Sequence, residues 1–109
     1  MKVDLYYSMQ DDSTMFTLLE GIDVEGWHIP EGFLSEGASV PRAFWSYCSP
    51  LDGRYLDVFV WHDWAYAEHI LPRKKIDVLM RDLLIKRGMS KSKAYTIYYA
   101  VRAFGDSHY

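Results

Sequence analysis

A histidine, two aspartates and a tyrosine are spaced in this sequence so that two neighbouring helices could bring them together. The run His62-Asp63-x-x-Tyr66 places the histidine and the tyrosine one helical turn apart, with Asp63 beside them. Asp77 lies in the next apolar-periodic segment, beyond a short turn that contains Pro72. If the helices are antiparallel, His62 and Asp77 can form a hydrogen bond. A histidine oriented in this way can act as a general base, and a second carboxylate can bind a cation.

The same residues also fit a purely structural role. Buried polar groups are normally paired, so a buried His62 bonded to Asp77 can simply fasten two helices together. Paired titratable groups with shifted pKa values occur in both settings. Asp63 alone is a poor calcium site, because calcium prefers roughly six to eight oxygens, and a carboxylate on the helix surface is the simpler interpretation. The sequence leaves both roles open.

Composition narrows the classes to which the protein can belong. Its 109 residues are half hydrophobic and 17% aromatic, which is enough for one domain with one packed core. The net charge is −3 and no long basic block is present, so nucleic acid is not expected as a partner. The short run Arg73-Lys74-Lys75 is expected to be solvated at the start of a helix.

Cysteine usage and hydrophobic runs give further limits. Cys48 is the only cysteine, so no disulfide within the chain and no cysteine-based metal site is expected. This usage fits synthesis in a reducing compartment. The first residues lack the apolar core of a signal peptide. No apolar run approaches the roughly 20 residues that span a bilayer, so no transmembrane segment is expected.

The pattern along the chain predicts strands first and helices afterwards. Three segments have the length and composition of strands and are expected to form one small antiparallel sheet: 3–7, 15–19 and 27–29. Helical segments are predicted at about 40–48, 55–69, 76–84 and 94–104. Gly88 and Gly105 should end the last two, and Ser90 should cap the last. The prediction is one α+β domain over residues 1–109, with a small N-terminal antiparallel sheet packed on a C-terminal bundle of three longer helices.

Three residues near the first predicted helix have further expected roles. Ser39 is a candidate N-cap, and Gly37 before it is expected in a conformation that other residues disfavour, or close to another segment. Arg42 either bridges to backbone carbonyls or Asp63, or binds an anion.

A tyrosine-rich face of the last helix is either a partner surface or a partly solvated face, and it carries Tyr95, Tyr99 and Arg102.

Five motifs follow one another along the chain. They are Pro30-x-Gly32-Phe33, Gly37-Ala38-Ser39-Val40-Pro41-Arg42, His62-Asp63-x-x-Tyr66, Asp77, and Tyr99-x-Val101-Arg102-x-Phe104-Gly105. In this order they resemble the phage-associated family catalogued as domain of unknown function 1353, whose members occur mostly in bacteriophage and prophage genomes and whose biochemical role is not settled. The resemblance covers about residues 16–105. It implies a protein made in the bacterial cytoplasm, with other phage structural proteins as expected partners and the virion as one destination.

The paired helices alone show a second resemblance. His62-Asp63-x-x-Tyr66 and Asp77-x-x-Met80 are similar to the bacterial secreted His–Asp phospholipases. That resemblance implies that His62 is the base for water, Asp63 a calcium ligand and Asp77 the residue that orients the histidine. The chain lacks their disulfides, and the only candidate for their calcium loop is Ser35-Glu36-Gly37-Ala38. Glu36 stands where proteins of the phage family often carry Asp, so as a cation ligand it would reach one methylene further.

Two classes of function therefore remain. One is a non-catalytic virion, tail or accessory protein of a phage, in which Tyr66 and the His–Asp pair only hold the fold. The other is a calcium-assisted hydrolase of (phospho)lipid esters, with His62 as the base. No cofactor is expected in the first case, and calcium with a lipid substrate only in the second. Resemblance of fold cannot choose between them.

Overall fold

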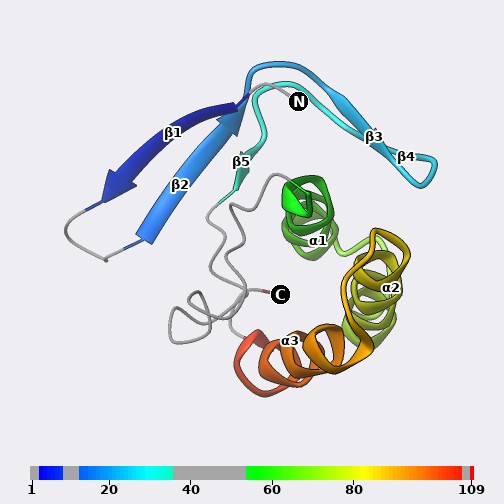
Figure 1. Ribbon diagram of the computed structural model, residues 1–109. Coiled ribbons are helices and arrows are strands. Elements are labelled where there is room, and N and C mark those ends of the chain that lie inside the picture. The colour runs from blue at the N-terminus through cyan, green and yellow to red at the C-terminus, as the bar shows by residue number, and fades with distance from the viewer. Residues whose placement is uncertain (1–2, 9–12, 36–53, 107–108) are drawn as a thin grey trace.

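A computed structural model describes residues 3–8, 13–35, 54–106 and 109 (Figure 1). The described strands are β1 (Val3–Ser8), β2 (Ser13–Leu18), β3 (Ile22–Val24), β4 (Trp27–Ile29) and β5 (Leu34–Ser35). The described helices are α1 (Leu56–Glu68), α2 (Arg73–Lys86) and α3 (Lys91–Phe104). This is the predicted α+β arrangement, with strands first and three longer helices after. The predicted helix at 40–48 and the predictions for Glu36, Gly37, Ser39, Arg42 and Cys48 lie outside the described residues.

The strands form two antiparallel sheets, whereas the sequence predicted one. One sheet has the order β1-β2-β5, and the other is the β3–β4 hairpin. The hairpin is inserted in sequence between β2 and β5. The chain leaves strand β2 at Leu18 and comes back beside this residue after the hairpin, where the Gly32 amide donates to the Leu18 carbonyl at 2.8 Å. The hairpin turns at Glu25 and Gly26, with φ of 49° and 84°. Such a turn needs positive φ at both positions, and glutamate there gives a weak sequence signal.

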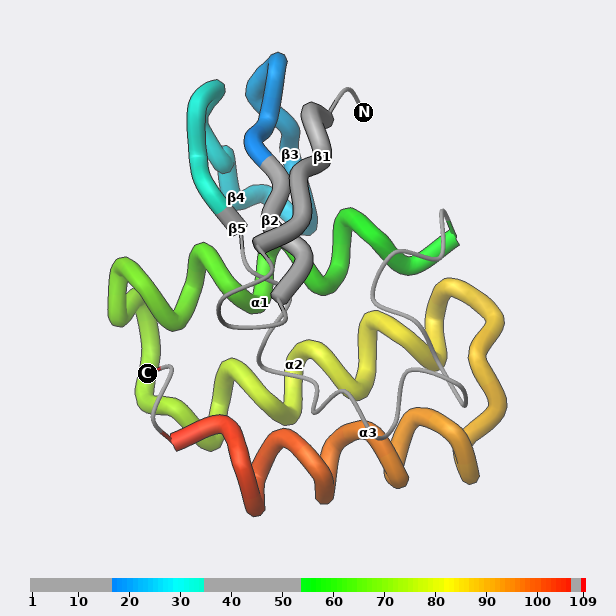
Figure 2. Tube along the Cα trace, turned by 90° about the vertical axis from the view of Figure 1, so that its left-hand side faces the viewer, coloured from blue at the N-terminus to red at the C-terminus, as the bar shows by residue number. Residues whose placement is uncertain are grey.

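The three helices lie side by side, with α2 between α1 and α3. Figure 2 shows that successive helices run in opposite directions and that the strands lie on the far side of α1. Helix α1 therefore packs against helix α2 on one side and against the strands on the other, so nearly all of its circumference is buried. A helix buried in this way is not expected to have a single apolar stripe. Its buried residues are Val58, Phe59, Val60, Trp61, His62, Ala65 and Tyr66. The β-layer adds Leu18, Val24 and Ile29 to the core.

The ends of the helices follow the predicted signals. The Ser90 side chain accepts a hydrogen bond from the Lys93 amide at 3.2 Å, which satisfies one of the unpaired donors at the start of α3. Gly88, just after α2, has a φ of 103°, a value that glycine adopts at little cost. Gly105 follows α3, as predicted. In the described part of the chain, no helix has the length and apolarity needed to cross a membrane.

We expect the Ser90 cap to contribute measurably to stability. Ser90→Ala should lower the free energy of unfolding by about 0.5–2 kcal/mol, because a donor at the start of α3 loses its acceptor. Ser92→Ala makes the same chemical change two residues further into the helix and should have a smaller effect. Urea unfolding of both variants measures the difference, and equal losses would contradict the capping role.

Candidate functional site

The carboxylate of Asp77 is the centre of the site. It accepts hydrogen bonds from His62 Nε2 at 2.7 Å and from the Tyr66 hydroxyl at 2.5 Å, both on Oδ1. Its other oxygen, Oδ2, accepts from Nη1 of Arg102 at 2.9 Å. Both His62 and Asp77 have 0% of their surface exposed. The hydrogen bond predicted between them across adjacent antiparallel helices is confirmed.

The sequence folds locally in a way that brings these groups together. His62 and Tyr66 lie one turn apart on α1, and their rings lie 4.2 Å apart between centroids. The turn after α1 is short, and Pro72 immediately precedes α2, so Asp77 comes soon after the chain reverses. Arg102 reaches the same carboxylate from the last turn of α3. Each of the three helices therefore supplies at least one member of the cluster.

Arg73 extends the cluster and corrects one prediction. Its Nε donates to the Tyr66 hydroxyl at 3.2 Å, and its Nη2 donates to the carbonyls of Val101 at 2.7 Å and Arg102 at 3.0 Å. These carbonyls are at the end of α3, where a helix runs short of amide donors of its own. The basic run was predicted to be solvated, which is wrong for Arg73 because its side chain is only 15% exposed. Lys74 and Lys75 are exposed.

Two further side chains lie differently from the sequence interpretation. Arg102 was assigned to the tyrosine face of α3, but its guanidinium bonds to Asp77, while Tyr95 and Tyr99 are exposed. Asp63 was interpreted as a surface carboxylate, but its side chain is only 13% exposed. Neither Arg73 nor Arg102 was predicted as a site residue. The one signal for Arg102 was its place in the last of the five motifs.

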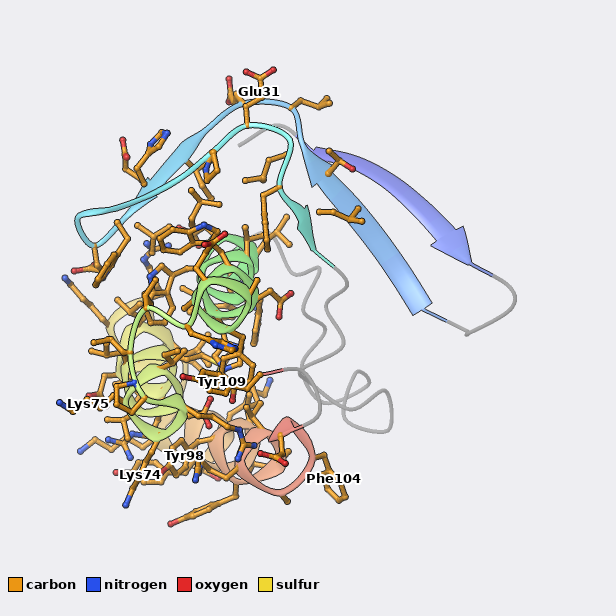
Figure 3. All side chains as sticks on the ribbon, turned by 180° about the vertical axis from the view of Figure 1, so that it is seen from behind. Glu31, Lys74, Lys75, Tyr98, Phe104 and Tyr109 are labelled. Carbon is orange, nitrogen blue, oxygen red and sulfur yellow. The ribbon has the colours of Figure 1, made fainter. Side chains whose placement is uncertain are left out.

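Tyr109 lies against the outer side of the cluster (Figure 3). Its ring stacks on His69 at 4.2 Å between centroids and meets the Tyr66 ring edge-on at 5.3 Å. Its hydroxyl donates to the Leu71 carbonyl at 3.0 Å. These contacts join Tyr109 to the turn between α1 and α2 and restrict the Tyr66 ring from one side.

Electrostatics keep Asp77 ionised although it is buried. Burial raises the pKa of a carboxyl group, but the hydrogen bonds from His62, Tyr66 and Arg102 outweigh it and hold the pKa of Asp77 below 3.8. Burial likewise opposes a charged imidazole, yet the carboxylates of Asp63 and Asp77 raise the pKa of His62 above 6.5. Burial and Asp77 raise the pKa of Tyr66, so its hydroxyl stays a donor.

The second ring nitrogen of His62 has no hydrogen-bond partner among the described residues. Nδ1 is buried, and Oδ1 of the neighbouring Asp63 lies 3.9 Å away, too far for a hydrogen bond. A carboxylate only accepts, so Nε2 carries the proton that bonds to Asp77. In the neutral ring, Nδ1 therefore has a lone pair available to accept a proton. A fixed ring with a lone pair available on its second nitrogen is one of the features that a general base requires.

The described residues do not fit a calcium site. Across 3–8, 13–35, 54–106 and 109, no group of three or more His, Cys, Asp or Glu side chains is placed to hold a metal ion. Asp63 is the only proposed ligand in this part of the chain, while Glu36 lies outside it, as does Arg42. Calcium needs several oxygens, so no chemistry at this site is assigned to calcium.

The profile of the family described as "Protein of unknown function (DUF1353)" matches residues 11–101, and the chain belongs to this family. "Uncharacterized protein y4iH" of Sinorhizobium fredii is 32% identical over 81 residues, which is 73% of this chain and 34% of that protein. The chain thus spans about a third of that relative. No solved structure matches.

The pKa shifts predict how stability depends on pH. The stabilisation from His62 should be complete below pH 6.5 and be lost as the pH rises through its raised pKa in the folded state. The stabilisation from Asp77 should be present above pH 3.8 and be lost as the pH falls through its lowered pKa. Urea unfolding of the wild type between pH 5 and 9 should therefore show stability falling at the alkaline end. His62→Gln should lack this fall, and an equal slope in both proteins would contradict the assignment.

Proposed function

We propose that this protein is a bacteriophage or prophage accessory protein in which His62 acts as the general base for the hydrolysis of an ester. The observation that carries the proposal is the imidazole itself, fixed by Asp77 through Nε2 and unpartnered at Nδ1 among the described residues. A buried polar atom without a partner needs an explanation, and a bound water that becomes the nucleophile is one. The link to phages rests on the resemblance of the five motifs, since the family itself is described only as a protein of unknown function.

The proposed reaction uses one proton transfer in each direction. Nδ1 of His62 takes a proton from water while the water oxygen attacks the ester carbonyl carbon. The imidazolium that forms is stabilised by the charge of Asp77, which Tyr66 and Arg102 keep ionised. When the tetrahedral intermediate collapses, the C–O bond to the alcohol breaks and Nδ1 returns the proton to the leaving oxygen. The products are a carboxylic acid and an alcohol.

A second candidate function is favoured by burial. His62 and Asp77 are both completely enclosed, as expected for a polar cluster that only fastens helices together. In this case the protein is a non-catalytic virion or tail component, and other phage structural proteins are its partners. The two candidates differ in what a change at His62 affects, namely turnover or stability.

His62→Asn separates them, because asparagine keeps a hydrogen-bonding group near the ring position but cannot take up a proton at neutral pH. We expect the variant to lose hydrolysis of p-nitrophenyl butyrate and of phosphatidylcholine vesicles by at least about 100-fold while it remains folded. Wild-type activity should rise with pH through the raised pKa of His62, because only the neutral ring accepts a proton.

The control is His28→Asn, since His28 is exposed on the β3–β4 hairpin and bonds locally to Asp23. It should retain wild-type turnover. Each assay is run with millimolar calcium and with chelator, and a calcium requirement that disappears in Asp63→Asn would add calcium to the site. If the wild type turns over neither substrate and His62→Asn mainly lowers the melting temperature, the hydrolase proposal is wrong and the structural function is retained.

A further inference from the structure

The outer face of α2 is apolar in its middle and lies on the far side of the helix from Asp77. A groove of about 520 Å³ runs along its first half, lined by Leu71, Pro72, Lys74, Lys75, Val78 and Leu79. Leu79 is 38% exposed, although it is one of the larger apolar side chains. Figure 3 shows that Lys75 extends from α2 away from the other helices.

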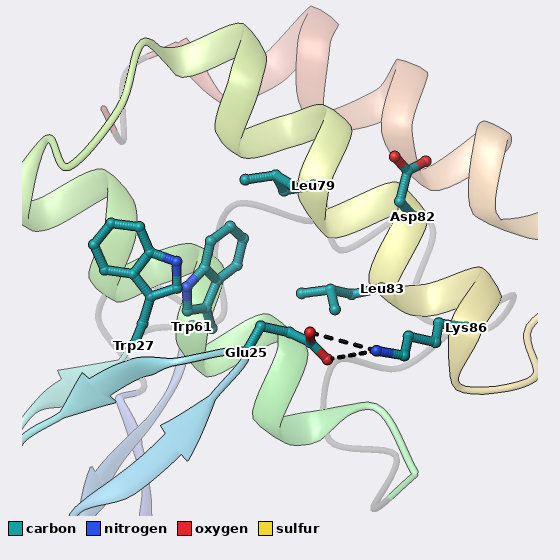
Figure 4. Close-up of a pocket in the computed structure, with 7 residues that line it drawn as sticks. All are labelled: Glu25, Trp27, Trp61, Leu79, Asp82, Leu83 and Lys86. Carbon is teal, nitrogen blue, oxygen red and sulfur yellow. Dashed lines mark hydrogen bonds and ion pairs between the residues drawn. The ribbon is translucent and has the colours of Figure 1, made fainter.

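A second hollow, of about 330 Å³, lies beyond Leu79 towards the β3–β4 hairpin (Figure 4). Its apolar walls are Trp27, Trp61, Leu79 and Leu83, and Asp82 lies at its rim. Leu79 lines both hollows, so it stands between them as a protruding apolar side chain. A surface with a protruding leucine flanked by two hollows can accept a matching leucine and offer its own in return.

One pair of opposite charges on this face is placed symmetrically about its centre. Lys75 lies three residues before Val78, and Asp82 lies three residues after Leu79. The Asp82 side chain is 56% exposed and pairs within its own helix with the neighbouring Arg81 at 3.1 Å. A carboxylate has lone pairs for further donors, so Asp82 can also accept from a lysine of another molecule.

We propose that a second copy of this chain binds here, with the two α2 helices antiparallel across a two-fold axis between Val78 and Leu79. In a symmetric contact, residue i meets residue j while residue j meets residue i. The antiparallel arrangement brings Lys75 to Asp82 of the second copy and Asp82 to Lys75 of the second copy. Leu79 of each copy enters a hollow of the other. Lys75 and Asp82 thus make the centre of this face complementary to itself in charge.

Charge reversal tests the contact in a way that only self-association can satisfy. In its homodimer, Lys75→Glu places a glutamate against Asp82 twice, and Asp82→Lys places two lysines together twice. Each variant alone should therefore dimerise about tenfold more weakly or worse. In an equimolar mixture, a dimer can form from one copy of each variant. One of its contacts joins the introduced glutamate at position 75 to the introduced lysine at position 82, and the other joins the unchanged Lys75 to the unchanged Asp82. Both contacts then join opposite charges, so the mixture should dimerise with about the wild-type affinity. Sedimentation equilibrium of the full chain from about 10 µM to 1 mM measures all three.

Lys91→Glu is the control, because it makes the same charge change at the start of α3 and should leave dimerisation unchanged. Leu79→Ser should weaken it without new charge, and thermal unfolding followed by circular dichroism verifies that every variant is folded. A wild type that stays monomeric throughout overturns the proposal, as does a mixture no more associated than its components. Monomers that bind vesicles of anionic lipid through Lys75 would overturn it too and would assign this face to a membrane surface.

Discussion

The buried charge of Asp77 is the constraint on which the rest of the helical structure depends. Removing a carboxylate from water costs several kcal/mol unless partners replace the lost hydration. Here the replacement comes from the two other helices, with His62 and Tyr66 on α1 and Arg102 on α3. Each donor has to lie within hydrogen-bond distance of the same two oxygens. The relative positions of α1, α2 and α3 are therefore fixed at this point more closely than apolar packing alone requires.

The same constraint passes from the carboxylate to the end of α3. Tyr66 donates a hydrogen bond to Asp77 and accepts one from Arg73, and Arg73 donates in turn to the carbonyls of Val101 and Arg102. Arg102, whose carbonyl is held in this way, is also the residue that pairs with Asp77 through its side chain. The cluster is thus a closed ring of contacts, and Nδ1 of His62 is left without a partner among the described residues. Structural rigidity and a chemically available nitrogen arise from the same set of bonds.

The sequence predicted part of this site because part of it is local. His62 and Tyr66 are separated by one turn, and the short connection through Pro72 leaves few ways to place Asp77, so the His62–Asp77 bond could be derived from spacing. Arg102 lies 25 residues after Asp77, and nothing in local periodicity indicates where its flexible side chain ends. Arg73 was misinterpreted for a related reason, since a basic run at a helix start is usually solvated. Strand β4 was predicted although it has only three residues, whereas β3 was missed because Gly21 and Gly26 around it indicated a loop, and β5 has too few residues to show a strand's alternation.

The protonation of the two nitrogens of His62 is the most direct test of this account. Nitrogen-15 NMR of the imidazole in the folded wild type, recorded as a function of pH, reports which nitrogen carries the proton in the neutral ring. We predict that Nε2 stays protonated, as the donor to Asp77, and that Nδ1 loses its proton with a midpoint above 6.5. A neutral ring protonated at Nδ1 would contradict both the bond to Asp77 and the assignment of His62 as a base.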